Sequence, residues 1–383
     1  MEFGQYEFYK TTALLFVVVG FLNYDVSVYS ANNRTERINS ILLSAFVLTC
    51  ICLLTSAFLF VFNDIFVKYT GCEIKEGWFW TLPVYAFFAA LTNLILIVLT
   101  RGGSFRIISY IKITVSILAA CTQLFFGWLN WGYWGLVYST IMVQIIAFLL
   151  HLKPFYKEFK GDFKFFSIRN MKSILRNYWR LPLIVFPGNF INNLVQSLPV
   201  FFLGRIDSQI LGYYALAQRI IGFPLKFVTA SVQRLYVKEL TSEIEKTGIG
   251  LNAYKKNLKI YGIIAIAVIL GLLVFTKPLL PILFGNKWLP AVPFVMALGI
   301  LFSVRFIFGG LSFIMVIGKA PKVDIFWQVF FAISMTLSFI VCEFFDASSF
   351  VTILIYVSVG VFSYFIYGVL GYSVAKSRKY LIN

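Results

Sequence analysis

The sequence predicts an all-α integral membrane protein, a polytopic helical bundle of two pseudo-symmetric lobes. Of its 383 residues, 60% are hydrophobic and only 13% are charged, and the mean hydropathy is +0.85. Soluble domains are nearer half apolar and roughly a quarter charged. The chain also holds 43 Phe, 21 Tyr and 8 Trp, an aromatic content that suits acyl chains and the headgroup belt. These values exclude an ordinary soluble protein.

The spans are predicted from the apolar segments. A helix that crosses a bilayer needs about 20 mainly apolar residues. Pro and Gly inside such helices are tolerated when neighbours satisfy the freed backbone groups. Eleven segments fit this description: 11–30, 40–62, 78–100, 107–128, 131–152, 181–203, 209–237, 258–276, 290–317, 324–342 and 349–375.

The distribution of basic residues predicts the orientation. If Lys376 and the C-terminal end are cytoplasmic, most of the 33 Lys and Arg fall on the cytoplasmic side, as the positive-inside rule requires. The net charge of +17 therefore indicates membrane topology and not nucleic-acid binding. This orientation places residues 1–10 outside and gives an odd number of spans. We therefore expect one further helix upstream of the sequence.

One long connection, residues 153–180, divides the chain. It carries many Lys and Arg interleaved with Phe, a pattern typical of an amphipathic helix on the inner leaflet; a solvated basic loop is the alternative. The expected organisation is a first lobe over 1–152 with five spans, the basic linker over 153–180, and a second lobe over 181–383 with six spans. Paired lobes of this size are a transporter architecture with the substrate near the bilayer midplane.

Four motifs, in order and suitably spaced, resemble those of Wzx-type polysaccharide flippases. They are Glu2-Phe3-Gly4-Gln5-Tyr6 with Asn23-Tyr24-Asp25; Leu198-Pro199 followed by Gly212-Tyr213-Tyr214-Ala215-Leu216-Ala217-Gln218-Arg219; Leu283-Phe284-Gly285-Asn286-Lys287-Trp288; and Gly318-Lys319 with Lys322. The family's first helix has no counterpart in the sequence.

The resemblance implies the multidrug/oligosaccharidyl-lipid/polysaccharide exporter fold, with twelve helices in two lobes working by alternating access in the bacterial cytoplasmic membrane. It also implies a lipid-linked oligosaccharide as substrate, undecaprenyl diphosphate carrying a sugar repeat unit. The partners would then be membrane lipids, a polysaccharide polymerase and glycosyltransferases.

Basic residues inside spans are the first candidates for substrate binding, because charge within a membrane is costly. Arg219 lies about 15 Å into its span at 1.5 Å per residue, and Arg305 is near the middle of another. Lys226 follows Arg219 on the same helix face, whereas Lys112 is close enough to a helix end to reach the surface. Guanidinium groups would bind diphosphate oxygens in pairs. A packing role is the alternative for each.

Amides and acids complete the predicted site. Asn189, Asn193 and Gln196, with Asn192, form one helix face that could bind sugar hydroxyls or bond to a neighbouring helix. Asp25 and Asp324 lie near cytoplasmic span ends, where they could bind a coupling proton or Na⁺ or be simply exposed.

The sequence favours a transporter over an enzyme, with no catalytic residue, metal or cofactor. It has no nucleotide-binding Gly loop, DxD pair or CxxC, and its one histidine, His151, lies at a helix end. Two alternatives stay open: a cation-coupled multidrug exporter of the same fold, and a membrane polysaccharide polymerase or glycosyltransferase. A drug exporter would need buried carboxylates, and a polymerase a large outer loop; the longest predicted one is 63–77.

Overall fold

The computed structural model describes residues 2–31, 33–62, 77–318 and 320–377, and within these ranges all regular structure is helical. Residues 63–76 of the predicted outer loop 63–77 lie outside the described residues, as does Lys319. The chain forms two compact units, Met1–Arg205 and Ile206–Asn383. The boundary between them falls after the segment 181–203, which the sequence assigned to the second lobe.

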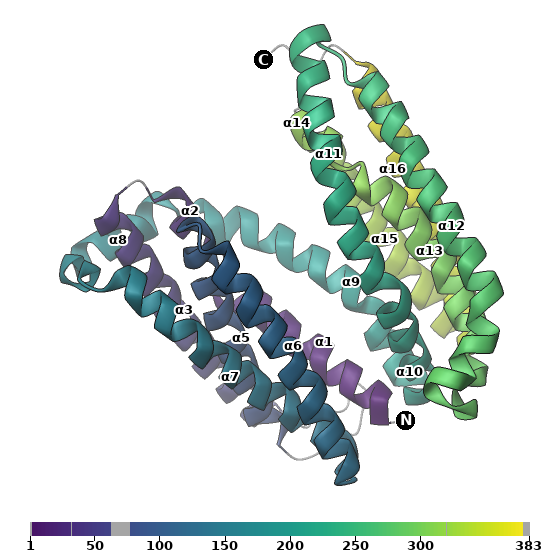
Figure 1. Ribbon diagram of the computed structural model, residues 1–383, viewed down its shortest axis with the longest axis horizontal. Coiled ribbons are helices and arrows are strands. Elements are labelled where there is room, and N and C mark those ends of the chain that lie inside the picture. The colour runs from purple at the N-terminus through teal and green to yellow at the C-terminus, as the bar shows by residue number, and fades with distance from the viewer. Residues whose placement is uncertain (1, 32, 63–76, 319, 378–383) are drawn as a thin grey trace. The chain divides into compact units, whose positions relative to one another are not determined.

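Unit 1 is a bundle built around α5 (Figure 1). Helix α5 packs against α1, α3 and α7, and α6 packs on α7. The elements of the unit are α1 (Glu2–Gly20), α2 (Val26–Ser30), α3 (Arg34–Val61), α5 (Trp78–Arg101), α6 (Phe105–Trp128), α7 (Gly132–Phe159), the short 3₁₀ turn η1 (Asp162–Phe165), α8 (Ile168–Asn177), the π-helical η2 (Leu181–Val185) and α9 (Phe186–Ile206).

Unit 2 is built around α13, which packs against α10, α11, α12 and α16. Neighbouring helices of the unit approach each other closely at glycines. A Cβ at Gly310 would lie 2.5 Å from the Tyr261 ring, and one at Gly368 would lie 2.1 Å from Phe308. Its elements are α10 (Ser208–Ala217), the π-helical η3 (Gln218–Gly222), α11 (Phe223–Thr247), α12 (Leu251–Phe284), η4 (Asn286–Ala291), α13 (Val292–Gly310), α14 (Phe313–Ile317), α15 (Pro321–Phe344) and α16 (Ser349–Lys376).

Eight helices within the described residues are long and apolar enough to cross a membrane. They coincide with the predicted spans 40–62, 78–100, 107–128, 131–152, 258–276, 290–317, 324–342 and 349–375. The remaining three predicted segments, 11–30, 181–203 and 209–237, are largely helical but are interrupted, and none of them is among the eight.

The prediction of one continuous span over 11–30 was wrong. Helix α1 already begins at Glu2 and ends at Gly20, and a turn separates it from α2. Leu22 and Asn23 adopt positive φ angles of 47° and 63° in this turn, which ends any α-helix. The guanidinium of Arg101 then binds the carbonyl oxygens of Val28 and Ala31, so the C-terminal end of α2 is satisfied within the protein.

The other two segments contain π-helical turns where the sequence has proline and glycine. Pro182 lies in η2, and η3 ends at Gly222 just before Pro224. Proline lacks a backbone N–H and clashes with the preceding turn, which explains the changed hydrogen-bond pattern.

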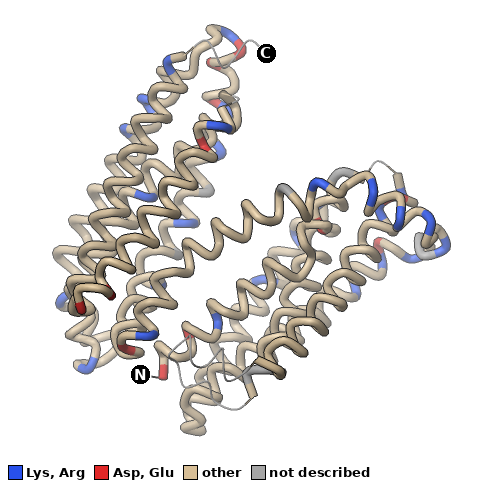
Figure 2. The backbone as a smooth tube through the Cα atoms, turned by 180° about the vertical axis from the view of Figure 1, so that it is seen from behind, with Lys and Arg blue, Asp and Glu red and all other residues tan. Residues whose placement is uncertain are grey.

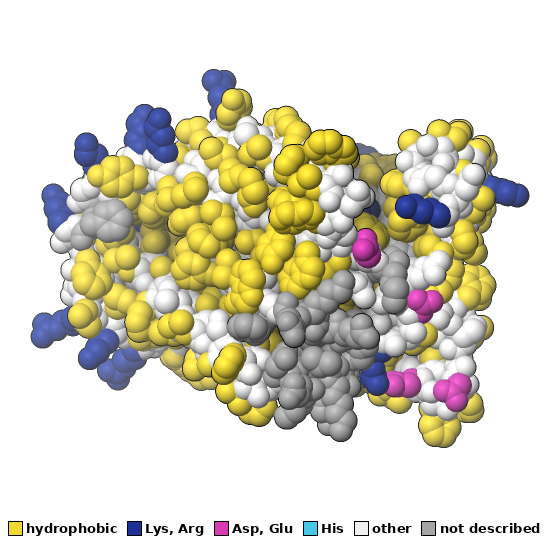
Figure 3. Space-filling model, turned by 90° about the horizontal axis from the view of Figure 1, so that it is seen from below, with side chains coloured by type: hydrophobic (Ala, Val, Ile, Leu, Met, Phe, Trp, Pro, Cys, Tyr) yellow, Lys and Arg dark blue, Asp and Glu magenta, His cyan; other side chains and the backbone are white. Residues whose placement is uncertain are grey.

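Large apolar side chains cover the outside of the helices. Leu124, Ile282 and Phe344 are 75%, 76% and 80% exposed, and Figure 3 shows a face on which hydrophobic side chains cover much of the surface. Exposed apolar surface on this scale is stable only against lipid. Figure 2 shows that basic residues of unit 1 gather at the end of the bundle that carries α8.

Asn39 anchors the start of the basic linker to α3. Its side chain is fully buried; Nδ2 donates to the carbonyl oxygens of Phe165 (3.0 Å) and Thr35 (2.7 Å), and Oδ1 accepts from the Ser167 amide (2.9 Å). The Tyr178 hydroxyl adds a hydrogen bond to Glu36 at 3.1 Å. These contacts hold the segment from η1 to α8 against the first half of α3.

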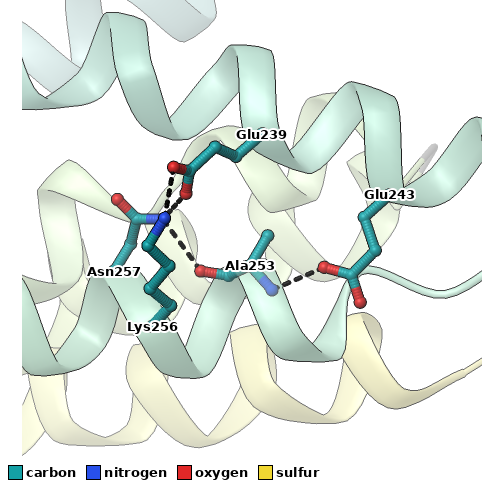
Figure 4. A network of polar contacts seen from close by, with 5 residues as sticks. All are labelled: Glu239, Glu243, Ala253, Lys256 and Asn257. Atoms are coloured by element: carbon teal, nitrogen blue, oxygen red, sulfur yellow. Dashed lines mark hydrogen bonds and ion pairs between the residues drawn. The ribbon is translucent and has the colours of Figure 1, made fainter.

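Two glutamates join α11 to α12 (Figure 4). The Glu243 carboxylate accepts hydrogen bonds from the Asn252 and Ala253 amides, and so caps the N-terminus of α12. Glu239 accepts from Lys256 Nζ at 2.6 Å and from Asn257 Nδ2 at 3.0 Å. The hydrogen bond from Lys256 lowers the pKa of Glu239, which therefore stays charged.

We expect Asn39→Ala to lower the free energy of unfolding by about 1–3 kcal/mol, because it removes two part-buried hydrogen bonds to the backbone of the linker. Trypsin should then cleave faster at Lys160 and Lys164 in detergent-solubilised protein. Asn177→Ala, at an exposed position on α8, is the control. Equal cleavage rates in both variants would contradict the anchoring role.

Candidate functional site

Arg305 lies in the middle of α13 and is surrounded by tyrosines of unit 2. Its half-buried guanidinium is within electrostatic range of the hydroxyls of Tyr364 and Tyr356 on α16 and Tyr214 on α10. The hydroxyls of Tyr214 and Tyr356 share a hydrogen bond, and their rings meet edge to face at 6.4 Å. We call these four residues the arginine–tyrosine cluster. It places one fixed cation among neutral hydroxyls inside a hydrophobic bundle.

A second polar group, around Asp324 on α15, adjoins this cluster. Tyr367 donates to Asp324 Oδ1 at 2.7 Å, and Gln328 Nε2 donates to Oδ2 at 2.9 Å. The Trp327 ring stacks on Tyr367 with centroids 4.0 Å apart and lies 5.3 Å from the Tyr364 ring. Polar and aromatic side chains therefore run from Asp324 to Arg305.

Trp327 is fixed in this arrangement by a hydrogen bond of its own. Its Nε1 donates to the Ser363 carbonyl oxygen at 2.8 Å, in the turn of α16 that also carries Tyr364. The interior of unit 2 thus brings together two of the predicted site residues, Arg305 and Asp324, through partners on α10 and α16.

Arg219 and Lys226 belong to the same unit. Arg219 is half-buried in the π-helical turn η3, directly after Gln218, whose Nε2 donates to the Tyr214 hydroxyl at 3.3 Å. Lys226 is exposed on α11. The predicted helix face that joins the two is therefore interrupted by η3, which the sequence pattern did not reveal.

The predicted amide stripe lies on α9, in unit 1. Asn193 Nδ2 donates to the Asn189 carbonyl oxygen at 2.7 Å, and Gln196 Nε2 donates to Asn192 Oδ1 at 3.1 Å. Asn189, Asn192 and Gln196 are exposed and Asn193 is half-buried. The stripe forms one face of the helix, as predicted.

Lys112 and Asp25 occupy separate places in unit 1. Lys112 is exposed on α6, within electrostatic range of the buried His151 on α7. Asp25 is half-buried in the turn between α1 and α2, where its own amide and that of Val26 hydrogen-bond to the carboxylate. Burial nevertheless raises the pKa of Asp25, because desolvation outweighs these two hydrogen bonds.

The sequence analysis missed one buried acid, Glu7. Only 8% of it is exposed within α1, and it lies within electrostatic range of Tyr85 on α5. The neighbouring Tyr6 hydroxyl pairs with Thr140 Oγ1 on α7 at 2.8 Å. The signal was present: no proline lies between Glu2 and Gly20, so a helix that begins at Glu2 carries Glu7 into the bundle.

An open cavity of about 350 Å³ lies in unit 1 and is lined by Glu2, Gly127, Asn130, Gly132 and Leu136, none of which was predicted. No group of three His, Cys, Asp or Glu able to hold a metal occurs in the described part of the chain.

The fold is that of multi-pass membrane transporters. The chain is similar to the lipid II flippase MurJ in an inward closed conformation, with a TM-score of 0.69 and 14% identity over 96% of this chain and 79% of that one. It is also similar to an inward-facing multidrug resistance MATE family transporter of the MOP superfamily, with a TM-score of 0.59 and 14% identity over 97% and 88%.

A comparison of the sequence with known protein families shows which family the chain belongs to. Residues 6–293 match the Polysaccharide biosynthesis protein family, and the chain belongs to it. A curated relative is the teichuronic acid biosynthesis protein TuaB of Bacillus subtilis, 22% identical over 170 residues. That match covers 44% of this chain and 34% of the relative, about a third of its length.

We expect Asp25→Asn to raise the melting temperature at pH 7, by on the order of 1–2 °C, because burial disfavours the carboxylate that the amide replaces. The folded-state pKa of Asp25 is raised, so wild type gains stability as the pH falls and Asp25 takes up its proton. The difference between variant and wild type should therefore shrink on acidification. Asp346→Asn, at an exposed position, should show no such change. A lower melting temperature for Asp25→Asn at pH 7 would contradict this.

Proposed function

We propose that this protein translocates undecaprenyl-diphosphate-linked oligosaccharide repeat units from the inner to the outer leaflet of the bacterial cytoplasmic membrane by alternating access, with its C-terminus in the cytoplasm. Membership of the Polysaccharide biosynthesis protein family and the fold shared with a lipid II flippase support this function. A polysaccharide polymerase and glycosyltransferases would be its functional partners.

The observation that carries the proposal is Arg305 among its tyrosines. A cation inside a hydrophobic bundle is costly unless a partner compensates for it. The cluster's tyrosine hydroxyls lie within electrostatic range of the guanidinium and can stabilise its charge by their dipoles. A diphosphate supplies oxygens that the guanidinium fork can bind in pairs.

The other predicted residues have assigned roles in the proposal. Arg219 is a second diphosphate ligand, and Lys226 and Lys112 attract the anionic headgroup at more exposed positions. On α9 the amides of Asn189, Asn193 and Gln196 bind sugar hydroxyls, which both donate and accept hydrogen bonds.

Asp324 and Asp25 are the candidates for coupling to a proton or Na⁺. The Asp324 carboxylate accepts hydrogen bonds from two neutral donors, Tyr367 and Gln328. These hydrogen bonds fix the position of the carboxylate and bring no positive charge to it. Asp25 is poised to take up a proton because its pKa is raised by burial.

A multidrug exporter is the second candidate, and Glu7 is the observation that favours it. The sequence argument against this function was the lack of buried acids, and Glu7 is one. Cationic drugs need such carboxylates. Expression in a drug-sensitive host decides between the two: export of cationic drugs that Glu7→Gln abolishes would favour the exporter.

We expect Arg305→Ala and Arg219→Ala each to reduce surface glycan per molecule of membrane protein at least roughly tenfold, the loss of a charge-assisted hydrogen-bond pair. Lys at either position should retain part of the activity, because the charge remains and the fork does not. Surface glycan and membrane protein level must both be measured. Arg106→Ala, at an exposed position on α6, is the control.

A structural role for the arginines gives a different result. The Ala variants would then lower the amount of membrane protein while glycan per molecule stayed constant. Normal glycan per molecule in the double variant Arg219→Ala/Arg305→Ala would refute the substrate-binding role.

For coupling, we expect Asp324→Asn to abolish the dependence of transport on an imposed pH or Na⁺ gradient in proteoliposomes, because the amide takes up no proton and offers Na⁺ no negative charge. Tyr367→Phe keeps the charge and removes one donor, so it should keep the dependence with altered ion affinity. An Asp324→Asn protein that still follows the gradient would show that coupling lies elsewhere, with Asp25→Asn the next variant to measure.

A further inference from the structure

Helix α8 and the segment 178–180 that follows it present three different stripes at the basic end of unit 1. At about 100° per residue, Met171, Ile174 and Tyr178 fall on one stripe, and Ile168, Leu175 and Trp179 fall on the next. The basic side chains of Arg169, Lys172, Arg176 and Arg180 follow on the third. The helix contains no acidic residue.

The first stripe is packed against the protein. Ile174 is buried with Tyr24 and Leu43, and Met171 and Tyr178 pack on the same cluster. The Tyr178 hydroxyl also donates to Glu36 at 3.1 Å. This stripe and the Asn39 anchor fix the rotation of α8, so the direction of the other two stripes is set by the fold.

The second stripe is apolar, yet its side chains are exposed within the part of the chain that the structure describes. Ile168, Leu175 and Trp179 are 64%, 39% and 47% exposed. Phe166, just before the helix, is exposed as well. An apolar stripe left open next to a packed one indicates an apolar environment outside the protein.

The positive charge of the third stripe indicates which apolar environment this is. Arg169, Lys172 and Arg176 are exposed and adjoin the apolar stripe directly, and the Arg180 guanidinium lies 5.7 Å from the centre of the Trp179 ring. An apolar stripe beside a basic one matches a bilayer surface, where acyl chains lie next to anionic headgroups. A protein partner would need a surface that is apolar and acidic in the same register.

We propose that α8 is a binding surface for anionic phospholipids: Ile168, Leu175 and Trp179 insert at the acyl boundary, and Arg169, Lys172 and Arg176 bind headgroup phosphates. The packed stripe joins this surface to Tyr24, next to Asp25 in the α1–α2 turn. Lipid bound to α8 therefore stabilises that turn and the start of α3 as well as the helix itself.

The test measures thermal unfolding of the full chain in detergent during titration with phosphatidylglycerol or phosphatidylcholine. Phosphatidylglycerol should raise the melting temperature and phosphatidylcholine should not, because a ligand that binds only the folded protein stabilises it. In Lys172→Gln/Arg176→Gln the phosphatidylglycerol midpoint should rise roughly tenfold to thirtyfold, given about 1 kcal/mol per basic residue at an anionic surface. Both positions are exposed, so the melting temperature without lipid should stay unchanged.

The matched control is Lys277→Gln/Lys287→Gln, which removes two exposed positive charges from unit 2 and should keep the wild-type midpoint. Ile168→Ser/Leu175→Ser should raise the midpoint while keeping its salt dependence, because the basic stripe remains. Glycerol 3-phosphate at matched concentration should give no stabilisation.

Three results would overturn the proposal. The first is an equal shift in the control variant, which would indicate unspecific charge attraction. The second is stabilisation by glycerol 3-phosphate alone, which would indicate a site for the soluble headgroup. The third is a change of oligomeric mass in the α8 variants with an unaltered lipid titration, which would make α8 an interface between copies of this chain.

Discussion

The hydrocarbon interior of a membrane offers no hydrogen-bond partner, and this constraint explains most features of the structure. Every backbone amide and carbonyl must be satisfied within the protein, so the described chain is helical and its apolar side chains face outward. Where a helix is interrupted, a side chain has to form the hydrogen bonds that the backbone groups lose. Arg101 binds the carbonyls at the end of α2, and Asn39 satisfies the linker before α8. Two interruptions also carry predicted functional residues, Asp25 in the α1–α2 turn and Arg219 in η3. Short π-helical segments often occur at functional sites.

The same constraint acts on the charged groups of unit 2. Arg305 and Asp324 are on different helices, and tyrosine hydroxyls lie near both of them: those of the arginine–tyrosine cluster near Arg305, and that of Tyr367 on Asp324. Tyr364 and Tyr367 lie one turn apart on α16, so a small rotation of α16 would alter the surroundings of both charges together. This arrangement gives the proposed coupling a physical route: a change of charge at Asp324 reaches the arginine–tyrosine cluster through Tyr367, Trp327 and Tyr364.

Hydropathy was sufficient to predict the fold class and the eight spans that the structure bears out. It failed at the N-terminus, where residues 1–10 were predicted to precede the first span, although α1 begins at Glu2 and Glu7 is buried in the bundle. A hydropathy window cannot distinguish a side chain that faces water from one that faces protein. The candidate arginines were identifiable because charge in an apolar run stands out. Their partners were not, because Tyr214, Tyr356 and Tyr364 reach Arg305 only through packing between α10, α13 and α16.

Phenylalanine and tyrosine, the two commonest aromatic residues of the sequence, occupy different places in the folded chain. Phe and Leu make much of the lipid-facing surface, with Phe344 at 80% and Leu124 at 75% exposed, whereas the largest fully buried side chains are mainly tyrosines. A phenol can donate and accept hydrogen bonds without the desolvation cost of a charge. An interior lined by hydroxyls is suited to the sugars of the proposed cargo, because sugar hydroxyls need neutral partners that can both donate and accept. The phosphates of that cargo need one or two cations. A cationic drug would need the opposite balance, in which the carboxylates outnumber Arg219 and Arg305. The tyrosine-rich interior therefore supports the proposed lipid-linked oligosaccharide cargo. In unit 1 the buried carboxyl group of Glu7 is the feature that would instead favour a cationic drug.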